Sequence, residues 1–588
     1  MRDRMVTYVP WVVAALCLIY VGTKLMPRTE THDGMNLSAF AALPVSYGGR
    51  FQPWDSVARN QLMVLSNRTS IDHAGEELSA VRWLLEAKAK PQVARDLVVF
   101  RIDEPSVKDV LGLGRAARDQ TRFSLAMIEP GLDALWQQAQ AASQLDRPQR
   151  SLFQRKAIEL AEHVETYMSL VNHIAAHSVP LVGSFETAES SGREDWLPLA
   201  EVMRQGPVVA GADPAVTGAY VRLLQAYAQG DAATFNAATA ELDTLLSMHA
   251  PRSAGIAAFE ARFNAVAPFT VSMFFYVLAG LVAMASWLVA PRALVRVGVA
   301  ILIVTLVLHT FGLASRIYIS GRPPVTNLYS SAVFIGWGAV ILALLLEPIL
   351  KHGLGVLTAA TLGFSTLLIA RALAADGDTM AVLQAVLDTN FWLATHVVVI
   401  TLGYSAVYLA GLLGIVYILR GVFTKTLTPP ESRKLGGMIY GVTCFGLLFS
   451  FVGTILGGIW ADQSWGRFWG WDPKENGALM IVLWGALMLH ARWGGMVKQR
   501  GLAVLAIGGN IITTWSWFGV NMLGAGLHSY GFIDSAVFWL MAFVTSQIVI
   551  IGIGLLPVSE WRSRVYQHVK PRSEERGASS EGVTPATA

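Results

Sequence analysis

The sequence predicts an all-α polytopic membrane protein with about ten transmembrane helices and a mainly helical extracytoplasmic domain between the first and the second. Three observations predict this class. Of the 588 residues, 53% are hydrophobic and only 15% are charged, whereas soluble proteins have about 25% charged residues. Apolar windows of membrane-spanning length recur along the chain. One long polar region, residues 27–267, separates the first window from the others. A large soluble enzyme is therefore excluded, and the net charge of +3 gives no indication of a nucleic-acid partner.

Ten charge-free windows are the predicted spans, because a helix needs about 20 apolar residues to cross the bilayer core. The windows are 5–23, 268–291, 297–315, 323–346, 353–370, 390–419, 435–461, 476–491, 501–533 and 535–559. We interpret residues 1–26 as an uncleaved anchor, since Lys24, Met26 and Pro27 stand where a small-residue cleavage site would be. The window 476–491 is short. The window 501–533 is so long that we expect its last part to lie at the membrane surface.

The basic residues of the loops predict the orientation. With the N-terminus in the cytoplasm, the cytoplasmic segments carry 17 Lys and Arg residues and the opposite short loops carry 5. Because short cytoplasmic loops are enriched in Lys and Arg, both termini are predicted to be cytoplasmic. The region between the first two spans is then extracytoplasmic.

Four parts follow along the chain: the anchor 1–26, the extracytoplasmic domain 27–267, a polytopic membrane domain 268–559 and a basic, disordered cytoplasmic tail 560–588. The domain 27–267 is predicted to be mainly helical, because apolar residues recur at three- and four-residue spacing in it. His173 and His177 are four residues apart on one predicted helix, which is a possible metal-binding pair. Without a third ligand, a surface or core position is the favoured interpretation.

The cysteines exclude several kinds of site. The chain has two, Cys17 and Cys444, and both lie in apolar runs. A disulfide framework, a CxxC redox pair, a zinc cluster and a CxxCH haem-attachment segment are therefore all excluded.

The most informative segment is the tryptophan-rich loop, residues 457–475, which the predicted topology places at the outer surface between the seventh and eighth spans. Its aromatic residues suit a flat, apolar ligand with a polar edge, although Trp residues also gather at membrane interfaces without any ligand. Asp472, Pro473 and Glu475 have the spacing of a helix start, while Arg467 and Lys474 are outer cations that could pair with ligand carboxylates. The candidate ligand-binding residues are Trp460, Trp465, Arg467, Phe468, Trp469, Trp471, Asp472 and Lys474.

Four histidines fall in or beside the apolar spans, where ionisable residues are costly and are functional candidates. His396 and His528 are predicted to lie at the same outer face as the tryptophan-rich loop, where two imidazoles suit the iron of a haem. His490 lies deeper, towards the inner leaflet. His309 lies in the third span and is the weaker candidate for pairing with it, because the predicted depths of the two differ.

The loop and histidine segments resemble a known family. Residues 465–475, WGRFWGWDPKE, resemble the tryptophan-rich signature of haem-handling proteins. The segment FWLATHV around His396 and the segment GLHSYG around His528 resemble the two histidine segments that flank this signature. GRPPVTNLY at 321–329 resembles an outer loop of the same proteins. Over roughly residues 290–556 the chain resembles the CcsA-type (ResC-like) subunit of the system II cytochrome c synthase. The domain 27–267 is not covered by this resemblance, apart from the segment GGRFQPWDSVARN, which is similar to one in extended members.

The resemblance implies a function and a set of roles. The ligand and substrate would be haem b, whose vinyl groups are joined as thioethers to the CxxCH thiols of apocytochrome c. His396 and His528 would be the outer axial ligands, and thus the catalytic residues. His490 would be the transmembrane ligand, with its counterpart supplied by a partner or by His309. The implied partners are a CcsB/ResB-like membrane subunit, apocytochrome c and thiol reductants of the apocytochrome pathway, at a bacterial inner membrane with residues 27–267 in the periplasm.

Three alternatives stay open. The first is a system I-type haem lyase or haem-delivery protein, although the DPKE and GLHSYG segments favour system II. The second is a membrane transporter or sensor without haem, in which the tryptophans form only an interface belt. In the third, the main function belongs to the domain 27–267, which serves as an assembly platform for apocytochrome or another maturation factor.

Overall fold

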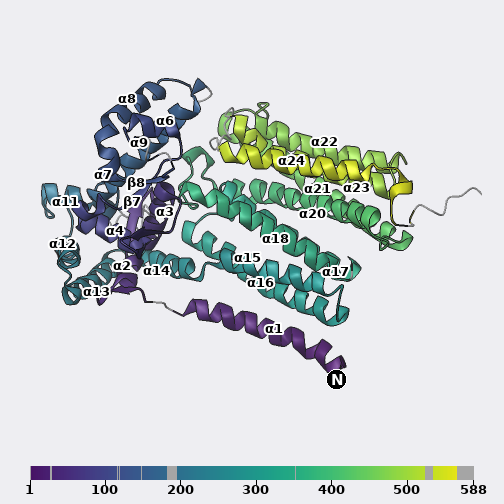
Figure 1. The fold of residues 1–588 in the computed structure, drawn as a ribbon, viewed down its shortest axis with the longest axis horizontal. Helices are drawn as coiled ribbons and strands as arrows, with labels where there is room; N and C mark the ends of the chain where they lie inside the picture. The colour runs from purple at the N-terminus through teal and green to yellow at the C-terminus, as the bar shows by residue number, and fades with distance from the viewer. Residues whose placement is uncertain are drawn as a thin grey trace, which may run out of the picture. The chain divides into compact units, whose positions relative to one another are not determined.

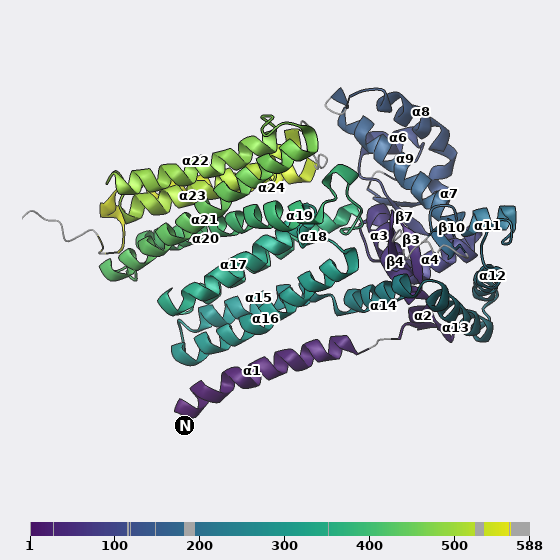
Figure 2. The same ribbon diagram turned by 180° about the vertical axis from the view of Figure 1, so that it is seen from behind.

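The computed structural model describes residues 2–26, 29–114, 117, 119–146, 149–181, 195–350, 352–523, 534–563 and 565. The chain forms two compact units. The first unit comprises residues 1–337 and 363–394, and the second comprises residues 338–362 and 395–588. The ribbon is drawn from opposite sides in Figure 1 and Figure 2.

The polar region of the first unit is built from short helices and small antiparallel sheets. Its helices are α2 (Leu37–Ala42), α3 (Trp54–Ser66), α4 (Ala80–Ala89), α5 (Pro91–Ala94), α6 (Pro105–Val110), α7 (Leu125–Ile128), α8 (Leu132–Ser143), α9 (Leu152–Val171), α11 (Leu199–Gln205), α12 (Pro214–Gln229), α13 (Ala232–His249) and α14 (Pro251–Val266), with a 3-10 helix η2 (Glu129–Gly131). The helices predicted from three- and four-residue spacing are therefore present.

Ten short strands in the same region were not predicted. They are β1 (Thr31–His32), β2 (Met35–Asn36), β3 (Pro44–Tyr47), β4 (Arg50–Pro53), β5 (Ser70–His73), β6 (Glu76–Ser79), β7 (Val98–Arg101), β8 (Arg122–Ser124), β9 (His177–Pro180) and β10 (Trp196–Pro198). The largest sheet has the order β10-β9-β3-β4, and the others are two-stranded. Strands of two to four residues are too short to show the alternation that identifies a strand in a sequence.

The predicted helical pair of His173 and His177 is wrong. Helix α9 ends at Val171, His173 has a left-handed backbone with φ 58°, and His177 begins β9. Each ring is instead held by a backbone carbonyl: His173 Nε2 lies 3.2 Å from the Lys88 oxygen, and His177 Nδ1 lies 2.9 Å from the Trp196 oxygen. The favoured structural interpretation of the two histidines is therefore supported, and among the described residues no group of three potential ligands could hold a metal ion.

A buried lysine lies in the core of this region. The Lys88 ammonium is 5.0 Å from the centre of the Trp54 ring, and it donates to the Leu170 carbonyl oxygen over 3.1 Å. Burial lowers the pKa of Lys88 to about 7.

Membrane-length helices follow in both units. The first unit contains α1 (Arg2–Leu25), α15 (Pro268–Ala285) and α16 (Pro291–Ser320), and it shares α17 (Leu328–Leu350) and α18 (Leu354–Leu373) with the second unit. Helices α1 and α15 both pack along α16, as both views of the ribbon show (Figure 1, Figure 2). Only Ala267, in a left-handed conformation with φ 47°, separates α14 from α15.

A connecting segment leads from α18 into the second unit. It contains η4 (Ala374–Asp376), η5 (Ala385–Leu387), α19 (Asn390–Trp392) and a π-helical turn η6 (Leu393–Val397). The second unit continues with α20 (Val398–Phe423), α21 (Pro429–Trp465), α22 (Pro473–Trp493), α23 (Gln499–Trp517), η7 (Gly519–Leu523), α24 (Asp534–Gly554) and η8 (Val558–Glu560).

Glycines let the helices of the second unit approach closely. Helix α20 packs along α21 and α23, and α22 packs on α23. A Cβ at Gly403 would lie 2.8 Å from the Ser450 backbone nitrogen, and one at Gly414 would lie 2.6 Å from the Ala503 oxygen. Small residues at such contacts are typical of helix packing in membranes.

The described part of the chain contains nine helices that are long and apolar enough to cross a membrane. They are Tyr8–Leu25, Pro251–Ala285, Pro291–Ser320, Leu328–Leu350, Leu354–Leu373, Asn390–Phe423, Pro429–Trp465, Gln499–Asn521 and Val537–Gly554. The remaining predicted span, 476–491, corresponds to α22, whose 21 residues would extend about 31 Å but include several polar side chains. The protein is thus an all-α polytopic membrane protein in its spanning part, as predicted.

Candidate functional site

The tryptophan-rich loop joins two helices of the second unit. Helix α21 ends at Trp465, and Gly466 follows with a left-handed φ of 67°. Asp472 caps the N-terminus of α22, since its Oδ1 accepts from the Lys474 backbone N–H over 2.8 Å. Glu475 Oε2 accepts in return from the Asp472 N–H over 3.1 Å and also from the Gly470 N–H over 2.8 Å. The predicted helix start is therefore confirmed as a capping box.

The aromatic side chains of the loop differ in exposure. Trp460 is buried, Trp465 and Trp469 are half-buried, and Phe468 and Trp471 are exposed, Trp471 by 70%. The Trp469 and Trp471 rings meet edge to face with their centres 6.1 Å apart. Trp471 has a left-handed φ of 55°, which is rare for a bulky residue and is a form of backbone strain that clusters at functional sites.

His396 lies against the last turns of α21 in the same unit. Its Nδ1–H donates to the Gly453 carbonyl oxygen over 2.8 Å, and its ring centre is 5.7 Å from that of Trp460. Because a carbonyl can only accept, Nδ1 carries a proton, and in the neutral ring the lone pair is then on Nε2. A backbone carbonyl holds metal-binding histidines in this tautomer. His396 also lies in the π-helical turn Leu393–Val397, and such turns are frequent at functional sites.

Two loop glycines accommodate the protein's own side chains. A Cβ at Gly457 would lie 2.6 Å from His396 Cε1, and a Cβ at Gly458 would lie 2.6 Å from Phe468 Cζ. In the structure the two glycines give room to the His396 and Phe468 rings.

The two loop cations have different surroundings. Lys474 Nζ donates to the Trp517 carbonyl oxygen over 3.0 Å, so it joins the start of α22 to the end of α23. Arg467 is exposed, and its guanidinium lies against Gly470, where a Cβ would clash with it. Of the two, Arg467 is the more accessible to a ligand carboxylate.

The remaining candidate histidines are not equivalent. His490, exposed near the end of α22, donates from Nδ1 to the Ala486 carbonyl oxygen over 2.8 Å, so that the lone pair of the neutral ring is on Nε2. His309, in α16 of the first unit, is fully buried. Its Nδ1 lies 2.9 Å from the Tyr276 hydroxyl, and its Nε2 lies 3.1 Å from the Val333 oxygen. His528 lies outside the described residues.

The part of the chain that contains His396 and the tryptophan-rich loop is similar to known proteins. Residues 325–528 match the family model described as "Cytochrome C assembly protein". The cytochrome c biogenesis protein CcsA of Synechococcus sp. (strain CC9902) is 32% identical over 278 residues, which are 42% of this chain and 90% of that protein. The chain belongs to the CcsA family of cytochrome c biogenesis proteins.

Two further relatives match shorter parts of this chain. CcsA of Chlamydomonas reinhardtii is 30% identical over 224 residues, which are 37% of this chain and 63% of that protein. Protein NrfI of Wolinella succinogenes is 35% identical over 231 residues, which are 38% of this chain but only 25% of NrfI. The chain thus matches a quarter of the length of NrfI.

The family segment divides the predicted residues into two groups. The 325–528 match includes His396, His490, His528 and the tryptophan-rich loop, whereas His309 and the domain 27–267 lie before it. Sequence reasoning missed Gly453, Gly457 and Trp517 as contacts of the site. The CcsA-type loop signature was the signal that could lead to them, since all three lie within the matched segment.

Proposed function

We propose that the chain binds haem b at the outer side of a bacterial inner membrane and presents it for covalent attachment to the CxxCH segment of apocytochrome c. The observation that carries this proposal is the position of His396, which is packed on Trp460 with its Nδ1–H tied to the Gly453 carbonyl. That arrangement suits Nε2 ligation of an iron. The exposed Phe468 and Trp471 rings offer flat apolar surface nearby along the chain, and Arg467 offers a cation for a propionate.

In this reaction the protein does not need to supply a nucleophile of its own. Each cysteine S–H adds across one vinyl C=C bond, so that a C–S and a C–H bond form and no external oxidant is consumed. The protein holds the haem, orients its vinyl edge and excludes water, and proximity supplies most of the acceleration. In this proposal the CxxCH histidine replaces one protein histidine on the iron, and the finished cytochrome then leaves.

We assign the other histidines as follows. His528 is the second outer ligand. His490 is the transmembrane ligand of an inner site through which haem enters, because its exposed ring has the tautomer that suits ligation through Nε2. His309 would have to give up either Tyr276 or the Val333 carbonyl to bind iron. We therefore assign the counterpart of His490 to a CcsB/ResB-like partner subunit.

The proposed topology has both termini in the cytoplasm and residues 27–267 in the periplasm, as the loop charges favour. It places the tryptophan-rich loop on the periplasmic side, where apocytochrome c and the thiol reductants that keep its cysteines reduced would meet it.

The test is a visible absorption spectrum of the detergent-purified protein, oxidised and then reduced with dithionite. The wild type is expected to give a sharp Soret band and, on reduction, the split α and β bands of low-spin haem. His396→Ala should lose the signal of the outer site and holocytochrome formation, and added imidazole should restore part of both. His32→Ala, which changes a histidine of the domain 27–267, is the matched control.

Two results would contradict the proposal. One is normal cytochrome maturation by His396→Ala without added imidazole. The other is a preparation that stays colourless after addition of haem and a CcsB-type partner, which would favour the transporter or sensor alternative.

A further inference from the structure

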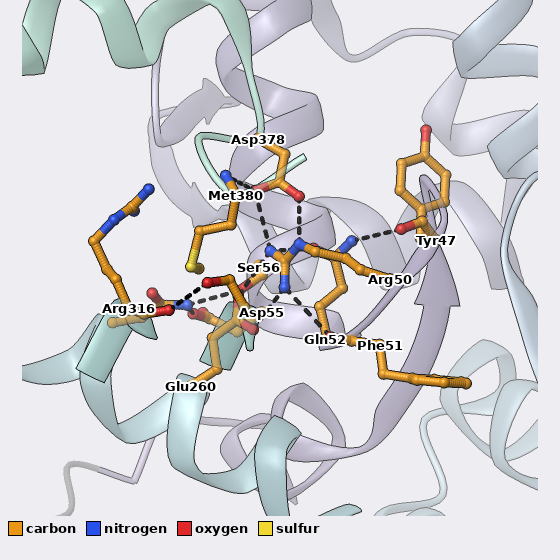
Figure 3. A network of polar contacts seen from close by, with 12 residues as sticks. Tyr47, Arg50, Phe51, Gln52, Asp55, Ser56, Glu260, Arg316, Asp378 and Met380 are labelled. Atoms are coloured by element: carbon orange, nitrogen blue, oxygen red, sulfur yellow. Dashed lines mark hydrogen bonds and ion pairs between the residues drawn. The ribbon is translucent and has the colours of Figure 1, made fainter. Parts of the chain in front are cut away.

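Arg50 is the centre of a buried ion cluster in the first unit (Figure 3). Its side chain is only 9% exposed. Nη1 and Nη2 lie 2.7 Å and 2.9 Å from the two carboxylate oxygens of Glu260, and Nε and Nη2 lie 2.5 Å and 3.1 Å from those of Asp378. Both carboxylates are thus bound through two hydrogen bonds, a geometry that only a guanidinium provides.

The cluster joins three separate parts of the chain. Arg50 begins β4, Glu260 lies on α14, and Asp378 lies in the segment between α18 and α19. Glu260 also accepts from the Ser56 hydroxyl over 2.6 Å, and Arg50 Nη2 donates to Gln52 over 3.1 Å. Because the Arg50 donors are all engaged within the protein, the cluster holds segments together and is not an open ligand site.

The segment that contains Asp378 is fastened at further points within the same unit. Thr379 supplies its carbonyl oxygen to Arg316 over 2.7 Å and to Asn327 over 2.8 Å. Asp378 Oδ1 accepts from the Met380 N–H over 2.9 Å. Further along the chain, Asp388 is paired with Arg322 through two hydrogen bonds of 2.8 Å and 2.6 Å.

This fastened segment is the one that leads into His396. Asp388 stands eight residues before His396, and the chain leaves the first unit at Ala394, two residues before it. The intervening residues form α19 and the start of the π-helical turn. Only α19 and the first residues of this turn therefore separate the fastened segment from His396 along the chain.

We propose that Arg50 and Asp378 are positioning residues for His396, because they tie the segment that leads along the chain to His396 to the domain 27–267. The inference rests on the proposed function, since it requires that His396 bind iron. It gives the domain 27–267, which precedes the family segment, a defined part in the reaction. Through Arg50 the domain holds Asp378, at the start of the segment that leads along the chain to His396.

The deciding variant is Asp378→Asn in the full-length protein. The asparagine Oδ1 can still accept from the Met380 N–H, but the charge that binds Arg50 is lost. Glu260→Gln breaks the other arm of the cluster and leaves the Arg50–Asp378 pair. Arg222→Gln, which removes an exposed ion pair with Glu241 in the same domain, is the control. Arg50→Lys keeps the charge but lacks the paired N–H groups, and it serves if Asp378→Asn does not fold.

Two measurements are made on each variant. Hydrogen exchange of the haem-free protein is expected to be about tenfold faster in residues 379–394 of Asp378→Asn, and unchanged there in Arg222→Gln. In the haem-loaded protein, Asp378→Asn is expected to lose low-spin haem and to lower holocytochrome formation roughly tenfold, and imidazole should restore the low-spin spectrum. Glu260→Gln should have the smaller effect on both measurements. A general folding defect would not respond to imidazole.

The outcomes distinguish a failure of the positioning role from a failure of the proposed function. The positioning role is overturned if hydrogen exchange in Asp378→Asn is the same as in the wild type. It is also overturned if exchange is faster but the haem spectrum is unchanged. In both cases the proposed function stands as long as His396→Ala loses haem. If His396→Ala has the wild-type spectrum, the proposed function fails and takes the positioning role with it.

Discussion

The His396 imidazole and Gly457 are in direct contact, so close that a methyl group on Gly457 would lie 2.6 Å from His396 Cε1 and 3.2 Å from Nε2. Helix α21 therefore defines the position of the ring twice, through this contact and through the Gly453 carbonyl one turn earlier. The position of the proposed ligand is thus set by residues that cannot themselves bind haem.

Gly457→Ala is expected to displace the His396 ring, since inserted methyl groups in packed sites cost about 1–3 kcal/mol. Low-spin haem should fall roughly tenfold while the protein stays folded. Gly441→Ala, in the same helix with open space around the added methyl, is the control. Haem stoichiometry per purified protein is the measurement, and equal stoichiometry in both variants would show that Gly457 does not position the ligand.

Trp471→Gly separates folding from ligand binding. Glycine adopts the left-handed conformation of residue 471 freely, which relieves about 1–2 kcal/mol of strain, so the thermal midpoint should stay or rise. Haem affinity should fall about five- to tenfold, as expected for the loss of one aromatic contact. Trp539→Ala, which removes a tryptophan of α24 that is 69% exposed, should change neither. Unchanged haem affinity in Trp471→Gly would contradict the proposed platform.

Asp472 is expected to act as a helix cap and not through its charge. Asp472→Asn keeps a good N-cap side chain and should retain haem and activity. Asp472→Ala should lower stability by about 1 kcal/mol and reduce haem binding through a displaced loop. Thermal unfolding and haem titration check this, and a large loss of haem in the asparagine variant would indicate a direct electrostatic role.

Lys88 should make stability depend on pH. Its folded pKa of about 7 lies below the unfolded value near 10.5, so the unfolded state binds more protons between these values. The cost of burying the cation is therefore fully present below pH 7 and is relieved as the pH rises above it. Wild-type stability should rise by roughly 3 kcal/mol from pH 6 to pH 9 relative to Lys88→Met.

Chemical unfolding of the full-length protein in detergent, followed by tryptophan fluorescence, measures this dependence. Lys156→Met, which removes an amine at the surface of α9, is the control and should keep the wild-type slope. If wild type and Lys88→Met run parallel across this range, burial does not lower the pKa of Lys88.

Sequence alone was sufficient where the signal is local. The spans follow from hydropathy, and the capping box follows from the Asp472–Glu475 spacing, because three residues specify it. It was insufficient where the partners are distant. Gly453 is 57 residues from His396, and Glu260 and Asp378 are 210 and 328 residues from Arg50. Such contacts depend on how the elements pack.

The histidines illustrate the same limit. In the sequence, His309 and His490 are equally isolated polar residues in apolar runs. The structure distinguishes them, since His309 is fully buried between Tyr276 and the Val333 carbonyl whereas the His490 ring is exposed. A sequence shows that a histidine is costly at a position, but not which groups satisfy it.

The single residue between α14 and α15 has a mechanical consequence. Ala267 is the whole connection between the membrane helix and the helix that carries Glu260. Transmembrane helices change their tilt to match the thickness of the surrounding bilayer. A change in the tilt of α15 would therefore be transmitted through this single residue to Glu260, and from Glu260 to Arg50. The geometry of the ion cluster is then expected to depend on the lipid composition of the membrane.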